Sequence, residues 1–110
     1  MRQWEIYLFP FREEKPHPAV IISNDERCVN EDLEYVNALI CTSARLNRET
    51  KKNEVMLNAA DGLDWKMAVR CDVIYLLPKL EFRERCGKVS LQRRTAIARK
   101  IAETLRLPMV

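Results

Sequence analysis

The sequence places two opposite charges, Arg70 and Asp72, in a run from residue 67 to residue 76 that is otherwise apolar and strand-like. Side chains alternate between the two faces of a strand, so these two are expected to point the same way, roughly 6 to 7 Å apart. An arginine can hold phosphate oxygens with paired hydrogen bonds, and an aspartate can act as a base if burial raises its pKa. The alternative is a salt bridge on a solvated face, which would contribute only about 0 to 1 kcal/mol.

The single histidine, His17, is the second candidate for proton chemistry. It lies between Pro16 and Pro18, which restrict the backbone on both sides of the imidazole. Imidazole titrates near neutral pH, whereas a guanidinium stays protonated, so His17 is a better proton donor or shuttle than Arg70. The roles could also be exchanged, with His17 as the base and Asp72 orienting it. The alternative is an incidental loop histidine.

Length and composition predict one domain spanning residues 1–110, because 110 residues with 47% apolar content can bury one core but not two. The four cysteines lack the spacing of a zinc site, and Cys41 and Cys71 lie in apolar runs that suit buried thiols. We therefore expect a protein of the reducing cytoplasm with no cofactor. No apolar run reaches the roughly 18 to 20 residues that span a bilayer, and the amino terminus has no secretory core, so we expect neither export nor anchoring.

Charge and glycine content bear on the class of ligand. The net charge of +3 is too small to establish a nucleic-acid partner by itself, although the segment from Arg83 onward is locally basic. Those cations could attract phosphates or only keep a helix soluble. Two glycines in the whole chain leave no phosphate-cradling loop, which excludes the dinucleotide-binding and P-loop classes.

The elements that would position these residues are mostly short strands. Alternating or continuous apolar runs predict strands over residues 3–9, 19–22, 35–42, 54–57 and 67–76, with a helical turn or loop over 25–33. A helix is predicted from the N-cap Ser90 to Leu105, with polar faces that carry Arg93, Arg94 and Lys100. Its apolar face is expected to consist of Ile97, Ala98, Ile101 and Leu105. The pattern indicates a small, mainly antiparallel β-barrel with a C-terminal α-helix.

Four segments, taken together, resemble a known family. They are Trp4-Glu5-Ile6-Tyr7, the stretch from His17 to Asp25, Cys41-Thr42-Ser43 and Val69-Arg70-Cys71-Asp72. Their order and spacing resemble those of the PemK/MazF group of toxin–antitoxin growth inhibitors. The resemblance extends from Trp4 to Leu107.

The resemblance implies an SH3-like antiparallel β-barrel that forms a homodimer, and a metal-independent endoribonuclease that cleaves single-stranded RNA, often mRNA. By position, Arg70 and Asp72 match the pair that serves catalysis in the PemK branch, while Thr42 and Ser43 match residues that line the same site. Most relatives have arginine where this chain has His17. The implied partners are a second copy of the chain and a small antitoxin with an acidic or amphipathic tail, which could occupy a basic RNA channel.

Cleavage of RNA without a metal needs a base for the 2′-hydroxyl, a cation for the phosphorane charge and an acid for the departing 5′-oxygen. His17, Arg70 and Asp72 are the candidates for these roles, and Thr42 and Ser43 would contribute hydroxyl hydrogen bonds. Loss of His17 or of Asp72 is predicted to reduce cleavage by at least about 100-fold.

Two other functions are also consistent with the sequence. A related toxin group with the same barrel inhibits DNA gyrase without cutting nucleic acid. That group relies on apolar and aromatic residues at the end of its helix, where this chain has Leu107-Pro108-Met109-Val110, with no aromatic. The other reading is a non-catalytic SH3-like interaction module, for which the His17 replacement is the main support. Phe11 and Tyr75 could stack an RNA base or belong to the core.

Overall fold

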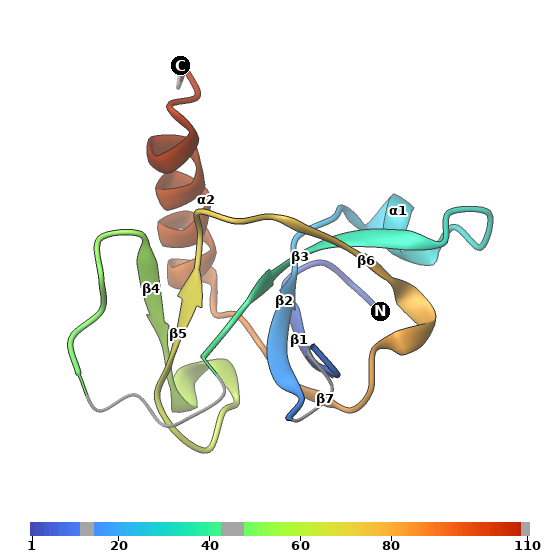
Figure 1. Cartoon of the computed structure of the whole chain (residues 1–110), viewed down its shortest axis with the longest axis horizontal. Coiled ribbons are helices and arrows are strands. Elements are labelled where there is room, and N and C mark those ends of the chain that lie inside the picture. The colour runs from blue at the N-terminus through green and yellow to red at the C-terminus, as the bar shows by residue number, and fades with distance from the viewer. Residues whose placement is uncertain (12–14, 43–47, 109–110) are drawn as a thin grey trace.

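The computed structural model describes residues 1–11, 15–42 and 48–108, which form seven strands, two α-helices and two short 3-10 helices (Figure 1). The first part of the chain contains β1 (Glu5–Phe9), β2 (His17–Ile21), α1 (Asp25–Val29), β3 (Tyr35–Ile40) and β4 (Glu54–Leu57). The second contains η1 (Ala59–Asp61), β5 (Met67–Arg70), β6 (Tyr75–Pro78), η2 (Lys79–Glu81), β7 (Arg85–Lys88) and α2 (Leu91–Leu105). The strands predicted over residues 3–9, 19–22, 35–42 and 54–57 are confirmed, apart from a few residues at their ends.

Every strand pair is antiparallel. Five strands form one sheet in the order β6-β3-β2-β1-β7, and β4 and β5 form a second sheet. The two sheets meet where β3 ends, through a bridge between Cys41 and Val69 and a backbone hydrogen bond of 2.9 Å from Thr42 N to Ala68 O. The mainly β prediction with a C-terminal helix is therefore confirmed, but the described strands form two open sheets and not a closed ring.

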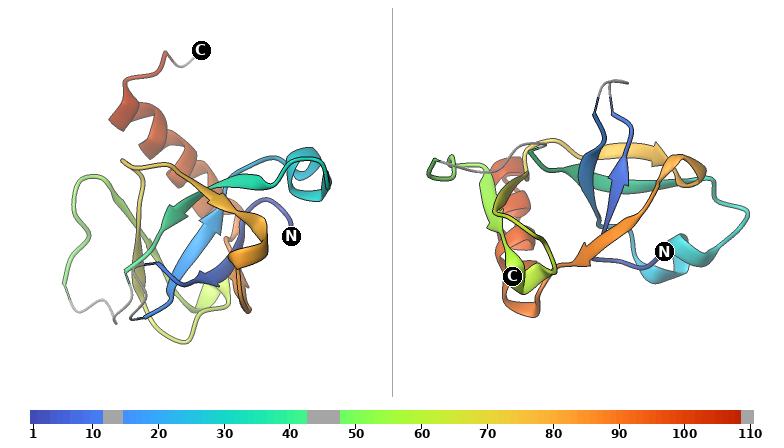
Figure 2. Two further views of the ribbon diagram at one scale, coloured as in Figure 1. Left: turned by 45° about the vertical axis from the view of Figure 1, so that its right-hand side comes forward. Right: turned by 90° about the horizontal axis from the view of Figure 1, so that it is seen from below.

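Apolar side chains pack on both faces of the five-stranded sheet. On one face, Ile6, Val20 and Leu39 meet Val69 of the small sheet and Ile97 of α2, all with 0% exposure. Figure 2 shows the small sheet and α2 together on this side of the larger sheet. The opposite face carries a second cluster, made of Phe9, Ala19, Ile21, Cys28, Val36, Ala38, Ile40 and Leu77. The sheet is thus buried on both sides, as its continuous apolar runs require.

The predicted single strand over residues 67–76 is wrong, because the chain passes from one sheet to the other within it. β5 ends at Arg70 in the small sheet, and β6 begins at Tyr75 as an edge strand of the large sheet. Between them, the Cys71 amide donates to Asn53 O at 2.9 Å and its side chain is fully buried. The bend at this buried residue directs Asp72 back toward Arg70.

Helix α2 begins after Ser90 as predicted, but its buried face is narrower than the apolar spacing indicates. Ile97 and Ala102 are its buried residues, whereas Ala98 is exposed and Leu105 is 46% exposed. The carboxyl end of the helix projects beyond both sheets in Figure 1, and Ala102 is the buried residue of its last turn. In the part of the chain that the structure describes, no helix is long and apolar enough to cross a bilayer.

Candidate active site

An open pocket of about 250 Å³ lies where the two sheets meet. Its walls come from the loop after β1, from β2, from the end of β3, and from β5 and β6. The lining residues are Phe11, His17, Ile40, Cys41, Thr42, Arg70 and Tyr75. Antiparallel pairing of β1 with β2 and of β2 with β3 carries His17 beside the end of β3. The pocket therefore brings together three of the residues predicted from the sequence, namely His17, Thr42 and Arg70.

The ring of His17 is fixed on two sides. Its Nδ1 lies 3.1 Å from the carbonyl oxygen of Cys41, and the ring of Phe11 packs edge-on against it at a centroid distance of 6.2 Å. A carbonyl oxygen can only accept, so Nδ1 carries a proton and donates it in this contact. In the neutral ring, Nε2 is then the nitrogen that has a lone pair. The backbone of Cys41 thus sets the tautomer in which Nε2 can take up a proton.

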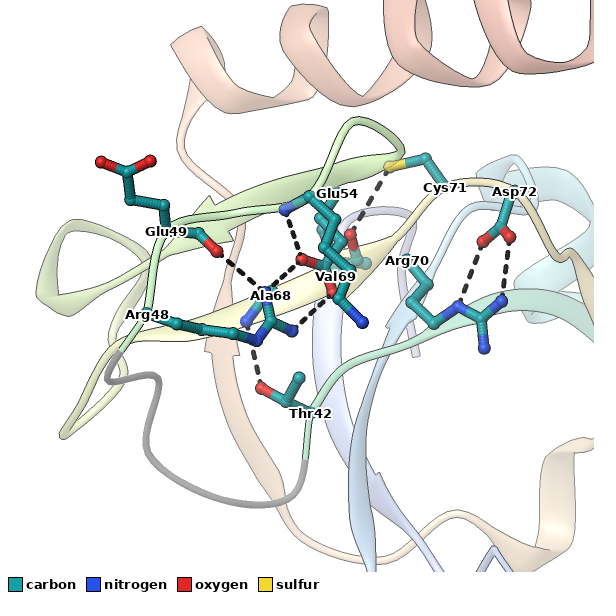
Figure 3. Close-up of polar contacts among 10 residues, drawn as sticks. Thr42, Arg48, Glu49, Glu54, Ala68, Val69, Arg70, Cys71 and Asp72 are labelled. Atoms are coloured by element: carbon teal, nitrogen blue, oxygen red, sulfur yellow. Dashed lines mark hydrogen bonds and ion pairs between the residues drawn. The ribbon is translucent and has the colours of Figure 1, made fainter.

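Thr42 ties the pocket to the small sheet. Its Oγ1 accepts a hydrogen bond of 3.1 Å from Ala68 N, while its own amide donates to Ala68 O at 2.9 Å. Figure 3 shows the hydroxyl next to β5. A hydroxyl that accepts through one lone pair still has its proton to donate. Thr42 can therefore donate to an anion in the pocket while it holds the two sheets together.

Arg70 and Asp72 form a two-pronged ion pair at the rim of the pocket (Figure 3). Nε lies 3.2 Å from Oδ1 and Nη2 lies 2.9 Å from Oδ2, and the side chains are 51% and 24% exposed. The predicted proximity of the two side chains is confirmed, and both remain in reach of a ligand. Asp72 is not among the residues that line the pocket; it contacts the site through Arg70.

The condition under which Asp72 would serve as a base, a pKa raised by burial, is not met. Hydrogen bonds from the Arg70 guanidinium lower the pKa of the Asp72 carboxyl, and the Asn53 side chain lowers it further. A carboxylate with a lowered pKa is a weak base near neutral pH. The group that Asp72 orients is Arg70, whereas His17 is oriented by the Cys41 carbonyl. The side-chain partner of Asp72 at this site is therefore the Arg70 guanidinium.

Stability is expected to fall on acidification, since the pKa values of Glu5, Glu54 and Asp72 are all lowered in the folded protein. A carboxyl with a lowered pKa stabilises the fold above its unfolded value, about 4, and loses that contribution as the pH falls through the folded value. Urea unfolding midpoints measured between pH 6 and pH 3 should therefore decrease, mostly below about pH 5. A midpoint that stays constant over this range would contradict these ion pairs.

The other residues singled out in the sequence differ in their relation to the pocket. Ser43 lies outside the described residues, so its place in the site stays a prediction. Phe11 and Tyr75 both line the pocket and pack against each other at 5.0 Å, and both also cover the second apolar cluster. Cys41 also lines the pocket, but burial strongly raises the pKa of its thiol. That thiol is therefore a poor nucleophile.

A second ion pair beside the site was not predicted. Glu54 lies directly opposite Arg70 in the β4–β5 pair, and its carboxylate is held by both terminal nitrogens of Arg48, at 2.8 and 3.0 Å. The only sequence signal was an acidic residue at the start of a predicted strand. Its register with Arg70 depends on the connection over residues 58–66, whose geometry the sequence pattern does not define. Over the described ranges, no group of three or more His, Cys, Asp or Glu side chains is placed to hold a metal ion.

Solved structures with the same fold include toxins of toxin–antitoxin pairs. An endoribonuclease in complex with its cognate antitoxin, from a mycobacterial species, has a TM-score of 0.81 at 24% identity, with 100% of this chain and 99% of that chain covered. A second structure, of an endoribonuclease from a mycobacterial species, has a TM-score of 0.79 at 25% identity, with 100% of this chain and 95% of that chain covered. The MazE-MazF complex of Deinococcus radiodurans has a TM-score of 0.76 at 18% identity, with 98% and 97% covered.

The sequence of the chain identifies its family. No curated protein is a significant match to the sequence. Residues 2–105 match the family described as PemK-like, MazF-like toxin of type II toxin-antitoxin system. The match spans all four segments on which the resemblance rests. The protein therefore belongs to the PemK-like, MazF-like toxin family of type II toxin–antitoxin systems.

Proposed function

We propose that this toxin is an endoribonuclease that cleaves single-stranded RNA without a metal ion, with mRNA as the expected target. One observation carries the proposal: an imidazole of fixed tautomer, a hydroxyl and an arginine fork line the same open pocket. His17, Thr42 and Arg70 come from distant parts of the chain. Few ligands other than a phosphodiester would use all three, because the set combines proton transfer with anion binding.

The reaction is an attack by a ribose 2′-hydroxyl on its neighbouring phosphate. The 2′-oxygen–phosphorus bond forms and the bond from phosphorus to the 5′-oxygen breaks, which leaves a 2′,3′-cyclic phosphate and a 5′-hydroxyl. His17 Nε2 takes the proton of the 2′-hydroxyl and returns it to the departing 5′-oxygen. Arg70 and Thr42 donate hydrogen bonds to the phosphate oxygens, where charge builds in the transition state.

Asp72 acts as a positioning residue in this scheme. A bidentate contact fixes the plane of the Arg70 guanidinium and leaves its other N–H groups to bind phosphate. Arg70 stays protonated and so supplies the cation that a metal ion supplies in other nucleases. Its 51% exposure allows a phosphate to approach from solvent.

Single-stranded RNA suits the walls of the pocket. Phe11 and Tyr75 are only partly buried there, and an aromatic face can stack an unpaired base. The bases of an A-form duplex are stacked on one another and are not available for this contact. We therefore expect the toxin to cut loops and linear single strands and to leave duplex intact.

The proposal includes two protein partners, a cognate antitoxin and a second copy of this chain. The mycobacterial endoribonuclease that shares the fold is in complex with its cognate antitoxin, and the Deinococcus protein is in a MazE-MazF complex. An antitoxin segment that binds over Arg70 would compete with RNA for the same guanidinium. Neutralisation by competition is therefore the expected mode of control.

The test is incubation of the purified toxin with one defined single-stranded RNA and with its duplex, both in EDTA. We expect cleavage of the single strand and an intact duplex. A second assay measures the supercoiling activity of DNA gyrase in the presence of the toxin. Inhibition of gyrase with no cleavage of RNA would contradict the proposal, as would inactivity in both assays.

A further inference from the structure

A second guanidinium lies beside the pocket. Glu54 and Arg70 are directly opposite each other in the antiparallel pair of β4 and β5, so their side chains leave the small sheet on the same face. The Arg70 side chain is 51% exposed and paired with Asp72, whereas the Glu54 side chain is only 4% exposed and is paired with Arg48. In the view of Figure 3, Arg48 and Arg70 lie on opposite sides of Glu54.

The Glu54 carboxylate holds Arg48 in one orientation. Nη1 and Nη2 of Arg48 donate to the two carboxylate oxygens at 2.8 and 3.0 Å, and the Lys51 amide donates to Oε1 at 2.7 Å. Nη1 also donates to the carbonyl oxygen of Glu49 at 2.9 Å. A buried carboxylate needs such partners, since an isolated buried charge is costly. The planar fork of Arg48 is therefore ordered before any ligand arrives.

Arg48 nevertheless remains available to a ligand. Its side chain is 39% exposed, whereas Arg93, whose ion pair with Asp61 is interior, is 21% exposed. A guanidinium has five N–H donors, and the contacts above use three of them. Among the described residues, Nε and one hydrogen of Nη2 have no acceptor. An arginine that is held by a carboxylate and still exposes donors is suited to a phosphate oxygen.

We propose that Arg48, held by Glu54, binds a second backbone phosphate of the RNA, next to the phosphate that Arg70 holds. This inference rests on the proposed function and adds a binding residue to the same site. Glu54 holds the Arg48 fork and lies directly opposite Arg70 in the β4–β5 pair, and Arg70 lines the pocket, so the RNA would continue from the pocket toward Arg48. Two arginines, each oriented by its own carboxylate, then fix the register of the strand on the protein.

Binding of an RNA oligonucleotide with 2′-O-methyl riboses tests the inference, because such an oligonucleotide has no 2′-hydroxyl and cannot be cleaved. Arg48→Ala should raise Kd about tenfold and reduce the slope of log Kd against log salt concentration by about 1. With a cleavable RNA, Arg48→Ala should raise KM about tenfold, in line with its Kd, because Arg48 holds the strand.

Two further variants show whether a loss of RNA binding is specific to Arg48. The double variant Arg48→Met with Glu54→Met removes the arginine without leaving a buried carboxylate unpaired, and it should bind as weakly as Arg48→Ala. Arg85→Ala is the matched control, since Arg85 is 49% exposed and pairs with Glu5 at 2.7 Å on the β1–β7 side of the large sheet. This control should bind RNA like the parent.

The possible outcomes distinguish a failure of the Arg48 role from a failure of the proposed function. Parent-like affinity of a folded double variant would overturn the role of Arg48 and leave the proposed function intact. Equal losses in the double variant and in Arg85→Ala would also overturn it, because any exposed arginine would then serve. Failure of the parent itself to bind or cleave single-stranded RNA would overturn the proposed function together with this inference.

Discussion

Replacing His17 with alanine is expected to lower kcat for cleavage of single-stranded RNA by at least about 100-fold, the loss that follows removal of a group that transfers a proton. Of the described residues that line the pocket, only His17 has a side-chain type that titrates near neutral pH. Its Nδ1 is hydrogen-bonded to the Cys41 carbonyl oxygen, so Nε2 is the nitrogen that can exchange a proton with the RNA. The measurement is the single-turnover rate on one RNA at saturating enzyme.

His17→Asn is the control that separates chemistry from structure. Its amide nitrogen can replace Nδ1 as donor to the Cys41 carbonyl, but an amide does not transfer a proton at neutral pH. We expect this variant to melt like the parent, to bind RNA and to be as inactive as His17→Ala. A cleavage rate of His17→Asn within about threefold of the parent would refute the role of the imidazole.

Asp72→Asn should lower the rate without changing its dependence on pH. The asparagine side chain of this variant has one acceptor oxygen in place of two, so the Arg70 guanidinium keeps only one of its two hydrogen bonds and loses part of its orientation. The profile near neutral pH should not change, because the Arg70 guanidinium lowers the pKa of the Asp72 carboxyl in the parent. A profile whose inflection disappears in Asp72→Asn would instead identify Asp72 as the titrating base.

Replacing Arg93 with methionine is expected to cost about 3 to 5 kcal/mol of the free energy of unfolding. Arg93 Nη1 lies 2.7 Å from Oδ2 of Asp61, whose side chain has 0% exposure. The same carboxylate also accepts from Asn58 N at 2.9 Å and from Ser90 N at 2.8 Å. Asp61 thus links the turn after β4 to the start of α2, and without Arg93 its charge would be left without its cation in the interior.

Arg94→Met is the matched control for this prediction. Arg94 is the next residue of the same helix, and its Nε donates to the Val89 carbonyl at 2.9 Å without contacting a buried charge. The control should cost no more than about 1 kcal/mol. Urea denaturation followed by circular dichroism measures both. Equal losses in the two variants would show that Asp61 does not depend on Arg93.

Apolar spacing predicted strands such as Tyr35–Ile40 because most of their side chains are buried. It missed β7, whose sequence Arg85-Cys86-Gly87-Lys88 has no apolar run. Gly87 is required there by packing, since a Cβ at this position would collide with the Asp61 carbonyl. Such contacts between distant segments leave no mark in local composition.

The site was predictable only in part, because its geometry also depends on contacts between distant segments. The residue types of His17, Arg70 and Asp72 indicated proton transfer and phosphate binding, and the order of the segments resembled a known family. The direction in which the pKa of Asp72 is shifted depends on a bend at buried Cys71, which brings the carboxylate onto Arg70. Arg93 was assigned to a polar face because helical spacing does not show which polar positions meet a buried partner.

The chemical form of the RNA ends tests the central claim most directly. Fragments produced by the parent toxin in EDTA should end in a 2′,3′-cyclic phosphate and begin with a 5′-hydroxyl, as mass spectrometry can establish, and His17→Asn should produce none. Fragments that carry a 5′-phosphate and a 3′-hydroxyl would mean that water and not the 2′-hydroxyl attacks. That result would contradict the proposed roles of His17 and Arg70.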